Sequence, residues 1–308
     1  MKQCQPPPPL KPGDLLRVIA PSGTLREFEA FYKGVEIWRS RGYRVELGTT
    51  VDDRWGYLAG TDETRRHQLA DAWKDPECAG ILCARGGYGS ARLLEDWTWA
   101  PVNKPKWLIG FSDVTGLLWS LCQMGVSGVH APVLTTLASE PDWSIRRLFD
   151  WVEGKGLEPL QGTGWGGGST SGILLPANLT VATHFLNTPV QPQLDGVILA
   201  FEDVCEAPYR IDRLLTQWRL SGALQKVRGI ALGRFSRCDI TPGIPSFTVE
   251  EVLRDRLRDL GIAIVSDLSF GHDGGGNAAL PVGTQAHLDA DTGVLSFVAR
   301  AMPDRCQL

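Results

Sequence analysis

Apolar runs and helical patterns alternate along residues 14–135, and this alternation constrains the fold more than any other feature of the sequence. The run Leu15–Ala20 is almost continuously apolar, as expected for a strand with both faces covered. The next segment, Leu25–Ser40, repeats its apolar residues at helical spacing, and Gly42 follows as a typical C-terminal cap. Strands that alternate with helices over short links are typical of an α/β layer with a mostly parallel sheet. Further strands are predicted at 43–47, 79–84, 106–111 and 126–130, and further helices at 62–74, 90–97 and 113–124.

The pattern changes near residue 160. Residues 157–170 hold glycines at 162, 164, 166, 167 and 168 with little apolar content, which indicates a flexible linker. Beyond it, strands are predicted at 173–175, 196–201, 229–232, 262–266, 285–288 and 293–298, and helices at 209–219 and 249–260. We therefore predict a proline-rich disordered tail (1–13), an N-terminal α/β domain (14–160), a Gly-rich linker (161–170) and a smaller β-rich C-terminal domain with helices (171–308).

Charge, hydropathy and cysteine usage exclude several classes of protein. The net charge is −4 without a basic run, so a nucleic-acid partner is not expected. The longest apolar stretches, such as Gly196–Phe201, are far shorter than the ~20 residues of a membrane helix. The N-terminus shows Pro6–Pro9 in place of a signal-peptide core, and the seven cysteines form no CxxC pair. These features predict a cytoplasmic protein with reduced thiols.

The first candidate for chemistry is Gly110-Phe111-Ser112-Asp113. An apolar strand ends at a serine, and a predicted helix begins at once with Asp113. Such a strand–turn–helix placement exposes a hydroxyl and directs helix N–H groups toward it. The alternative is that Ser112 or Asp113 only caps the helix.

The second candidate is the loop Arg85-Gly86-Gly87-Tyr88-Gly89, which follows a predicted strand. Its bare backbone lets amide groups approach a negatively charged oxygen. The loop matches neither common nucleotide-binding motif, and an ordinary tight turn is the alternative. Arg85, Gly86 and Tyr88 are candidates for substrate contact, because a guanidinium matches the geometry of a carboxylate and Tyr88 could line a pocket.

Two later segments carry a carboxylate and an imidazole. Glu202-Asp203 follows a predicted strand, and His272 lies in the glycine-rich segment 271–277. Together with Ser112 they could supply a nucleophile, a base that takes its proton and a carboxylate that orients the base. Backbone amides of the glycine loop and of the residue after the serine could stabilise the oxyanion.

The same residues are also compatible with two other functions. A metal-dependent hydrolase could use an oxygen-rich set with one imidazole, although no tight ligand motif is present. The members of that set are Glu202, Asp203, Glu206, His272 and Asp273. A non-enzymatic module could instead hold a small acidic ligand between two lobes, with the same glycine loop and helix N-terminus.

Several segments in a fixed order point to a known family. They are Ala20-Pro21-Ser22-Gly23, Arg85–Gly89, Gly110–Asp113, Glu202-Asp203 with Tyr209–Arg213, and Gly271-His272 with Asn277 and Leu280–Gly283. In these segments, which span residues 14–298, the chain resembles the LD-carboxypeptidases, which remove the terminal D-alanine from murein tetrapeptides. One departure is Pro176-Ala177-Asn178-Leu179, where the family often has Gly-Gly-Asn-Leu. Asn178 and Leu179 are retained, so we expect a helix to start there.

The resemblance implies a serine peptidase with its site at the junction of two domains. It implies Ser112 as nucleophile, His272 as general base and Glu202 as the acid that orients it. The oxyanion hole would be the backbone N–H groups of Asp113 and Gly87. The resemblance also implies a cytoplasmic homodimer without metal or other cofactor, acting on a muropeptide or small peptide. A related branch cleaves peptidyl-nucleotide antibiotics such as microcin C, and this substrate class is the alternative.

Overall fold

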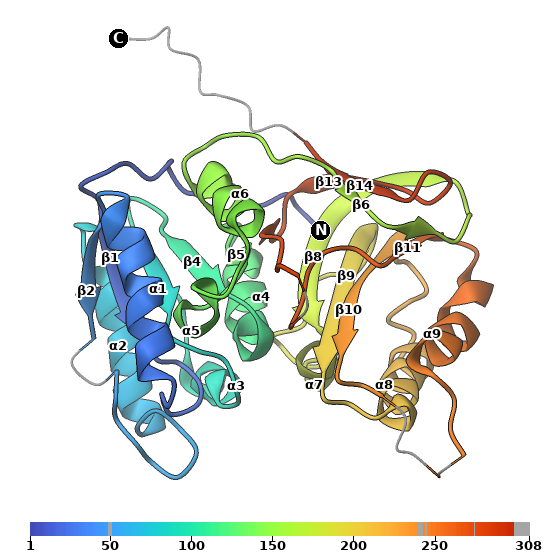
Figure 1. Cartoon of the computed structure of the whole chain (residues 1–308), viewed down its shortest axis with the longest axis horizontal. Helices are drawn as coiled ribbons and strands as arrows, with labels where there is room; N and C mark the ends of the chain where they lie inside the picture. The colour runs from blue at the N-terminus through green and yellow to red at the C-terminus, as the bar shows by residue number, and fades with distance from the viewer. Residues whose placement is uncertain (49–50, 240–242, 244, 274, 299–308) are drawn as a thin grey trace, which may run out of the picture.

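The computed structural model describes residues 1–48, 51–239, 243, 245–273 and 275–298. The strands of these residues form two sheets that lie side by side, each with its own helices (Figure 1). Within the described part of the chain, no helix combines the length and apolar character needed to cross a membrane.

The first sheet has the order β12-β5-β4-β3-β1-β2, and all its neighbours are parallel except β12 and β5. Successive residues of β3 belong to different core clusters: Ile81 packs with α2 and α4, and Leu82 packs with α1 and α6. Both faces are therefore covered, which explains the continuous apolar strands. The strands are β1 (Leu15–Ile19), β2 (Arg44–Leu47), β3 (Cys78–Cys83), β4 (Trp107–Gly110), β5 (Val129–His130) and β12 (Leu280–Pro281).

Helices α2 to α4 pack on one face of this sheet, and α1, α5 and α6 pack on the other. The helices are α1 (Phe28–Ser40), α2 (Asp62–Lys74), α3 (Ser90–Leu93), α4 (Thr115–Gln123), α5 (Leu134–Leu137) and α6 (Asp142–Val152), with short 3₁₀ turns η1 (Leu94–Asp96) and η2 (Ser112–Val114). The predicted mostly parallel sheet with flanking helices is thus confirmed. The sequence reading assigned no element to α5 and α6.

The second sheet has the order β6-β14-β13-β8-β9-β10-β11-β7. Its central strands β8 to β11 are parallel, and the strands on both sides of them are antiparallel. Its strands are β6 (Leu160–Gln161), β7 (Thr163–Gly164), β8 (Ser169–Asn178), β9 (Val197–Val204), β10 (Gly229–Ser236), β11 (Ala263–Ser266), β13 (Gln285–Asp289) and β14 (Val294–Phe297), and its helices are α7 (Leu179–His184), α8 (Pro208–Leu220) and α9 (Val249–Leu257), followed by η3 (Arg258–Leu260). The predicted β-rich second domain with helices is confirmed.

The proline-rich tail is packed against the protein, contrary to the prediction of disorder for residues 1–13. Cys4 and Leu10 are buried. The backbone N–H of Cys4 donates to the carbonyl of Gly283, and the N–H of Leu10 donates to the carbonyl of Val152. Apolar residues on either side of the prolines supply the anchors that composition alone did not reveal.

The predicted flexible linker is also part of a sheet. Residues 161–170 contain the end of β6, all of β7 and the start of β8. The glycines serve close backbone contacts: a Cβ on Gly164 would lie 2.0 Å from the carbonyl oxygen of Ala290. Gly162 and Gly167 make similar close backbone contacts, whereas Gly166 and Gly168 have open space around them and positive φ angles of 82° and 75°.

The C-terminal half of the chain also returns to the first sheet. Strand β12 pairs with β5, so that Leu280 lies opposite His130. This pairing covers the edge of the first sheet and ties the two halves together. The segment between β11 and β12 therefore crosses the junction between the two sheets, and it carries His272.

Candidate active site

Ser112 lies two residues after the end of β4, at the carboxyl edge of the first sheet. Its backbone is in the left-handed region with φ of 62°, which is uncommon for a residue with a side chain. Such a conformation persists only where surrounding contacts hold it, and it is frequent at active sites. The turn η2 begins at Ser112 and leads into α4. The predicted strand–turn–helix placement of this serine is therefore present.

Glu202 lies near the carboxyl end of β9 and is completely buried. The sequence predicted a strand that ends at Phe201, directly before Glu202, but β9 continues to Val204. In the neighbouring strand β8, Asn178 is its register partner. The side-chain Nδ2 of Asn178 donates to Glu202 Oε1 at 3.3 Å.

His272 lies in the crossing segment between β11 and β12. The residue before it, Gly271, has φ of +105°, and a Cβ there would lie 2.7 Å from Cβ of Glu202. Only glycine allows this approach of the loop to the buried carboxylate. Arg234 of β10 holds the loop by donating to the carbonyls of Gly271 and His272, at 3.1 Å and 3.3 Å.

These three side chains, which are separated in sequence, meet at the junction of the two domains. His272 Nδ1 lies 2.6 Å from Glu202 Oε2, and His272 Nε2 lies 3.1 Å from Ser112 Oγ. Both distances are within hydrogen-bond reach. The structure thus brings together the three residues that the sequence suggested, in the order serine, imidazole, carboxylate.

Burial and charge shift the pKa values of Glu202 and His272 in opposite directions. Burial opposes ionisation of Glu202, but the adjacent His272 and its hydrogen bonds outweigh burial, so the pKa of Glu202 lies below its usual value. Burial also opposes charging of His272, yet the Glu202 carboxylate dominates and raises the pKa of His272. The pair therefore combines a stable carboxylate with an imidazole that accepts a proton readily.

The glycine loop lies against the nucleophile. A Cβ on Gly86 would lie 3.2 Å from Ser112 Oγ and 3.8 Å from the backbone nitrogen of Asp113. The missing side chain thus leaves space where an acyl oxygen could lie beside these atoms. The N–H of Asp113 belongs to the first turn of a helix, where backbone donors have no intrahelical acceptor. Gly87 follows in the same loop with φ of +112°.

Asp113 also fastens the glycine loop to the serine turn. It is buried, and its Oδ2 accepts a hydrogen bond from the backbone N–H of Ser90 at 2.8 Å. The hydroxyl of Ser90 donates in return to the carbonyl of Asp113. The loop 85–89 and the turn at Ser112 are therefore held as one unit.

The predicted substrate contacts Arg85 and Tyr88 lie at the rim of this loop. The Arg85 guanidinium forms an ion pair with Glu27, with Nε and Oε2 3.3 Å apart. Tyr88 is 52% exposed, and its ring lies 5.8 Å from that of Tyr57. Arg85 is thus engaged within the protein, whereas Tyr88 remains open to a ligand.

The alternative metal-ligand set is not gathered in one place. Asp273 forms an ion pair with Arg237 at 2.8 Å. Asp203 accepts hydrogen bonds from the N–H and the hydroxyl of Thr180, and burial beside Glu202 raises its pKa to about 6. Among the described residues, no three His, Cys, Asp or Glu side chains are grouped so that they could hold a metal ion.

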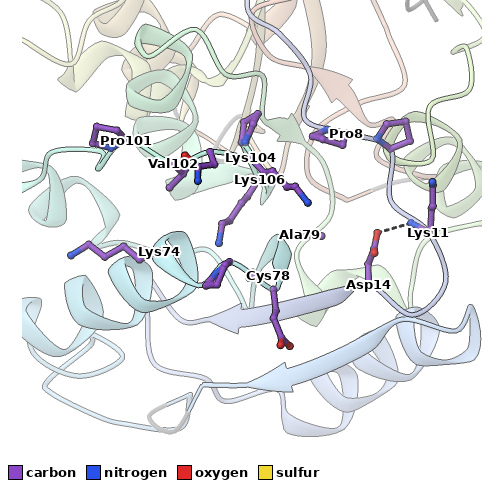
Figure 2. Close-up of a pocket in the computed structure, with 15 residues that line it drawn as sticks. Pro8, Lys11, Asp14, Lys74, Cys78, Ala79, Pro101, Val102, Lys104 and Lys106 are labelled. Atoms are coloured by element: carbon purple, nitrogen blue, oxygen red, sulfur yellow. Dashed lines mark hydrogen bonds between the residues drawn. The ribbon is translucent and has the colours of Figure 1, made fainter. Parts of the chain in front are cut away.

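A cavity of about 630 Å³ lies at the other edge of the first sheet. Asp14, Cys78 and Lys106, which border it, precede or begin β1, β3 and β4, whereas Ser112 follows β4. Figure 2 shows Lys74, Lys104 and Lys106 around it. Lys106 donates to the carbonyls of Ala72 and Asp75 at the end of α2. This cavity contains none of the three residues at the junction.

Sequence reasoning missed several residues that hold the site. Thr115 and Arg234 were not singled out, and Asn178 was expected only to start a helix. Asn178 does cap α7, through its Oδ1 and the N–H of Val181. The spacing of Asn178 and Glu202 at the ends of two strands was the available signal, but their pairing requires knowledge of the sheet order.

Comparisons with known proteins agree with this fold. Residues 16–131 match the LD-carboxypeptidase N-terminal domain, and residues 171–288 match the LD-carboxypeptidase C-terminal domain. The two domains together define a peptidase. The chain belongs to the LD-carboxypeptidase family.

Individual relatives span nearly the whole chain. The murein tetrapeptide carboxypeptidase of Pseudomonas aeruginosa is 30% identical over 89% of this chain and 92% of its own length. A Synechocystis protein, named as an inferred carboxypeptidase, is 60% identical over 95% of this chain and 97% of its own length. The crystal structure of muramoyltetrapeptide carboxypeptidase from Oxalobacter formigenes is 28% identical and has a TM-score of 0.81 over 91% of this chain and 97% of that chain.

Proposed function

We propose that this chain is a serine carboxypeptidase that hydrolyses the L,D-peptide bond holding the terminal D-alanine of murein tetrapeptides, as in cell-wall recycling. One observation carries the proposal: His272 is hydrogen-bonded through Nε2 to Ser112 Oγ and through Nδ1 to the Glu202 carboxylate. Family membership and the named relatives support the choice of substrate.

In the proposed reaction, Ser112 Oγ attacks the carbonyl carbon before the terminal D-alanine. His272 Nε2 takes the hydroxyl proton as the new C–O bond forms, because a serine hydroxyl is a weak nucleophile until a base removes its proton. Glu202 holds the Nδ1–H tautomer and stabilises the imidazolium. His272 then gives the proton to the leaving amine when the C–N bond breaks.

The carbonyl oxygen gains negative charge during this attack. The backbone N–H of Asp113 and that of Gly87 are the proposed donors, beside the space that Gly86 leaves open. Losing one such donor costs about 3–4 kcal/mol of transition-state stabilisation in measured cases. Water, activated by His272, then cleaves the acyl-enzyme ester and regenerates Ser112.

A substrate comparison tests the proposal. The purified chain is incubated with a murein tetrapeptide ending in D-alanine, with the same peptide ending in L-alanine, and with a peptidyl-nucleotide of the microcin C type. The proposal predicts release of D-alanine from the first substrate and little cleavage of the others. Cleavage confined to the peptidyl-nucleotide would assign the alternative substrate class.

A covalent probe separates the enzyme from a two-lobed binding protein. A fluorophosphonate reacts with an activated serine, so the proposal predicts labelling of Ser112. Labelling with the same stoichiometry in Ser112→Ala would contradict it. The cytoplasmic location and the homodimer remain predictions, which cell fractionation and sedimentation of the purified chain would test.

A further inference from the structure

Thr115 occupies a buried position between the two domains. It is the first residue of α4, three residues after Ser112, and it is completely buried. Its Oγ1 donates to the carbonyl of Ser112 at 2.8 Å. The same oxygen accepts a hydrogen bond from the backbone N–H of Asn178 at 3.1 Å. A hydroxyl has one proton and two lone pairs, so both contacts are satisfied together.

Asn178 connects this contact to the carboxylate of the second domain. Its Nδ2 donates to Glu202 Oε1 at 3.3 Å and to Asp203 Oδ1 at 3.0 Å. Its Oδ1 accepts from the N–H of Val181 at 3.1 Å, so the side chain is fixed from both ends. Asn178 therefore cannot rotate without losing contacts to Glu202 or to helix α7.

These contacts close a ring of hydrogen bonds. From Ser112 Oγ the ring passes to His272, then to Glu202, then to Asn178, then to Thr115 and back to the carbonyl of Ser112. The first domain contributes Ser112 and Thr115, and the second contributes the other three. Helices α4 and α7 meet at this point (Figure 1).

The ring of hydrogen bonds meets two geometric requirements of the proposed reaction: the backbone conformation of Ser112 and the position of Ser112 relative to His272. Ser112 is held in a left-handed conformation that an unsupported serine would leave. In addition, the nucleophile and its base come from different domains, and a misplacement of about 1 Å can lower a rate about 100-fold. Thr115 is the ring member that contacts the nucleophile's own backbone and the opposite domain through one atom.

We propose that Thr115 is a positioning residue, whose hydroxyl fixes the Ser112 turn against the domain that carries Glu202 and His272. This inference rests on the proposed serine mechanism. Thr115 touches no reacting atom, so its removal should slow the acylation of Ser112 and leave substrate affinity nearly unchanged.

The test compares four proteins by their rate of labelling with a fluorophosphonate and by kcat and KM for D-alanine release. Thr115→Val keeps the shape and removes the hydroxyl, whereas Thr115→Ser keeps the hydroxyl. Thr183→Val is the matched control, because the Thr183 hydroxyl also donates to a carbonyl, that of Leu179, and accepts from an N–H, that of Trp218. Thermal melting verifies folding, and Thr115→Ala replaces Thr115→Val if the latter does not fold.

We expect Thr115→Val to lower the labelling rate and kcat about 10- to 100-fold with little change in KM. For Thr115→Ser and Thr183→Val, the labelling rate and kcat should stay within about threefold of the wild-type values, because neither change removes the hydroxyl that positions Ser112. Equal rates for Thr115→Val and the wild type would overturn the inference, as would an equal loss in Thr115→Ser. Failure of the wild type itself to react with the probe would instead overturn the serine mechanism on which the inference rests.

Discussion

Glu202 Oε2 accepts two hydrogen bonds from His272, one from ring Nδ1 at 2.6 Å and one from the backbone N–H at 3.2 Å. A single buried oxygen therefore fixes both the tautomer of the ring and the position of the loop that carries it. The other oxygen, Glu202 Oε1, accepts a hydrogen bond from Asn178 Nδ2 at 3.3 Å, so both oxygens of the carboxylate are engaged.

Replacing the Glu202 carboxylate should strongly lower kcat. Glu202→Gln keeps the size of the side chain but lets an amide donate toward Nδ1, which favours the wrong tautomer of His272. In serine triads such a change lowers kcat about 10⁴-fold, and we expect a similar loss of D-alanine release. Glu206→Gln is the control, since Glu206 forms a partly exposed ion pair with Arg210. A Glu202→Gln enzyme with more than about a tenth of wild-type kcat would contradict the role given to Glu202.

Activity should depend on the protonation of His272. The imidazole must be neutral to accept a proton from Ser112, so kcat/KM should rise with pH as His272 loses its proton. Although burial alone would lower the pKa of His272, the Glu202 carboxylate raises it above the ordinary value of 6.5. The midpoint of the acid limb should therefore lie above 6.5.

His130 should not titrate in the same pH range as His272. It is completely buried beside Phe111, and burial lowers the pKa of His130 to about 4. A pH series of kcat/KM with the tetrapeptide measures the midpoint, and Glu202→Gln should move it downward. A midpoint below 6.5 in the wild type would show that Glu202 does not control the base.

The space left by Gly86 should be needed for catalysis. An added Cβ would lie 3.1 Å from Ser112 Cβ and 3.2 Å from Ser112 Oγ, where the substrate carbonyl must approach. We expect Gly86→Ala to lower kcat/KM at least about 100-fold, comparable to losing an oxyanion donor, with an unchanged melting temperature. Gly156→Ala is the control, because its Cβ would meet nothing within 4 Å. Full activity of Gly86→Ala would place the substrate carbonyl elsewhere.

The packed N-terminal segment should contribute to stability. Leu10 is 3% exposed, and Leu10→Ala should lower the free energy of unfolding by about 2–5 kcal/mol. Lys11→Ala, at an exposed neighbouring position, should change it by less than about 0.5 kcal/mol. Urea denaturation measures both. Equal stabilities of the two variants would mean that the segment is not held in solution.

The sequence predicted most of the first domain because its strands are continuous apolar runs, and because helices α1 and α4 repeat their apolar residues at helical spacing. Helix α2 (Asp62–Lys74) was predicted with its observed limits from its acidic first turn, and the structure adds a cap, the Thr61 side chain, which accepts from the N–H of Thr64. The Pro6–Pro9 run and the glycines at 162–168 misled the prediction, because their packing partners, such as Gly283 and Ala290, lie far away in sequence.

The three residues of the candidate site were accessible to sequence reasoning because each lies close to or beyond the carboxyl end of an apolar strand pattern and carries reactive chemistry. The residues that hold these three in place could not be predicted from the sequence. In the sequence, Thr115 looks like any polar residue near a helix start. Its proposed role depends on the hydrogen bond from the backbone N–H of Asn178 in the other domain. Pairings between domains are set by the order of strands in the sheets, which local patterns do not encode.

The most direct test of the serine mechanism is the rate of D-alanine release from a murein tetrapeptide by purified Ser112→Ala, measured beside the wild type with a metal chelator present in both. We expect steady release by the wild type and a loss of at least about 10³-fold in the variant, because alanine offers no nucleophile to His272. Release by Ser112→Ala at the wild-type rate would contradict the serine mechanism.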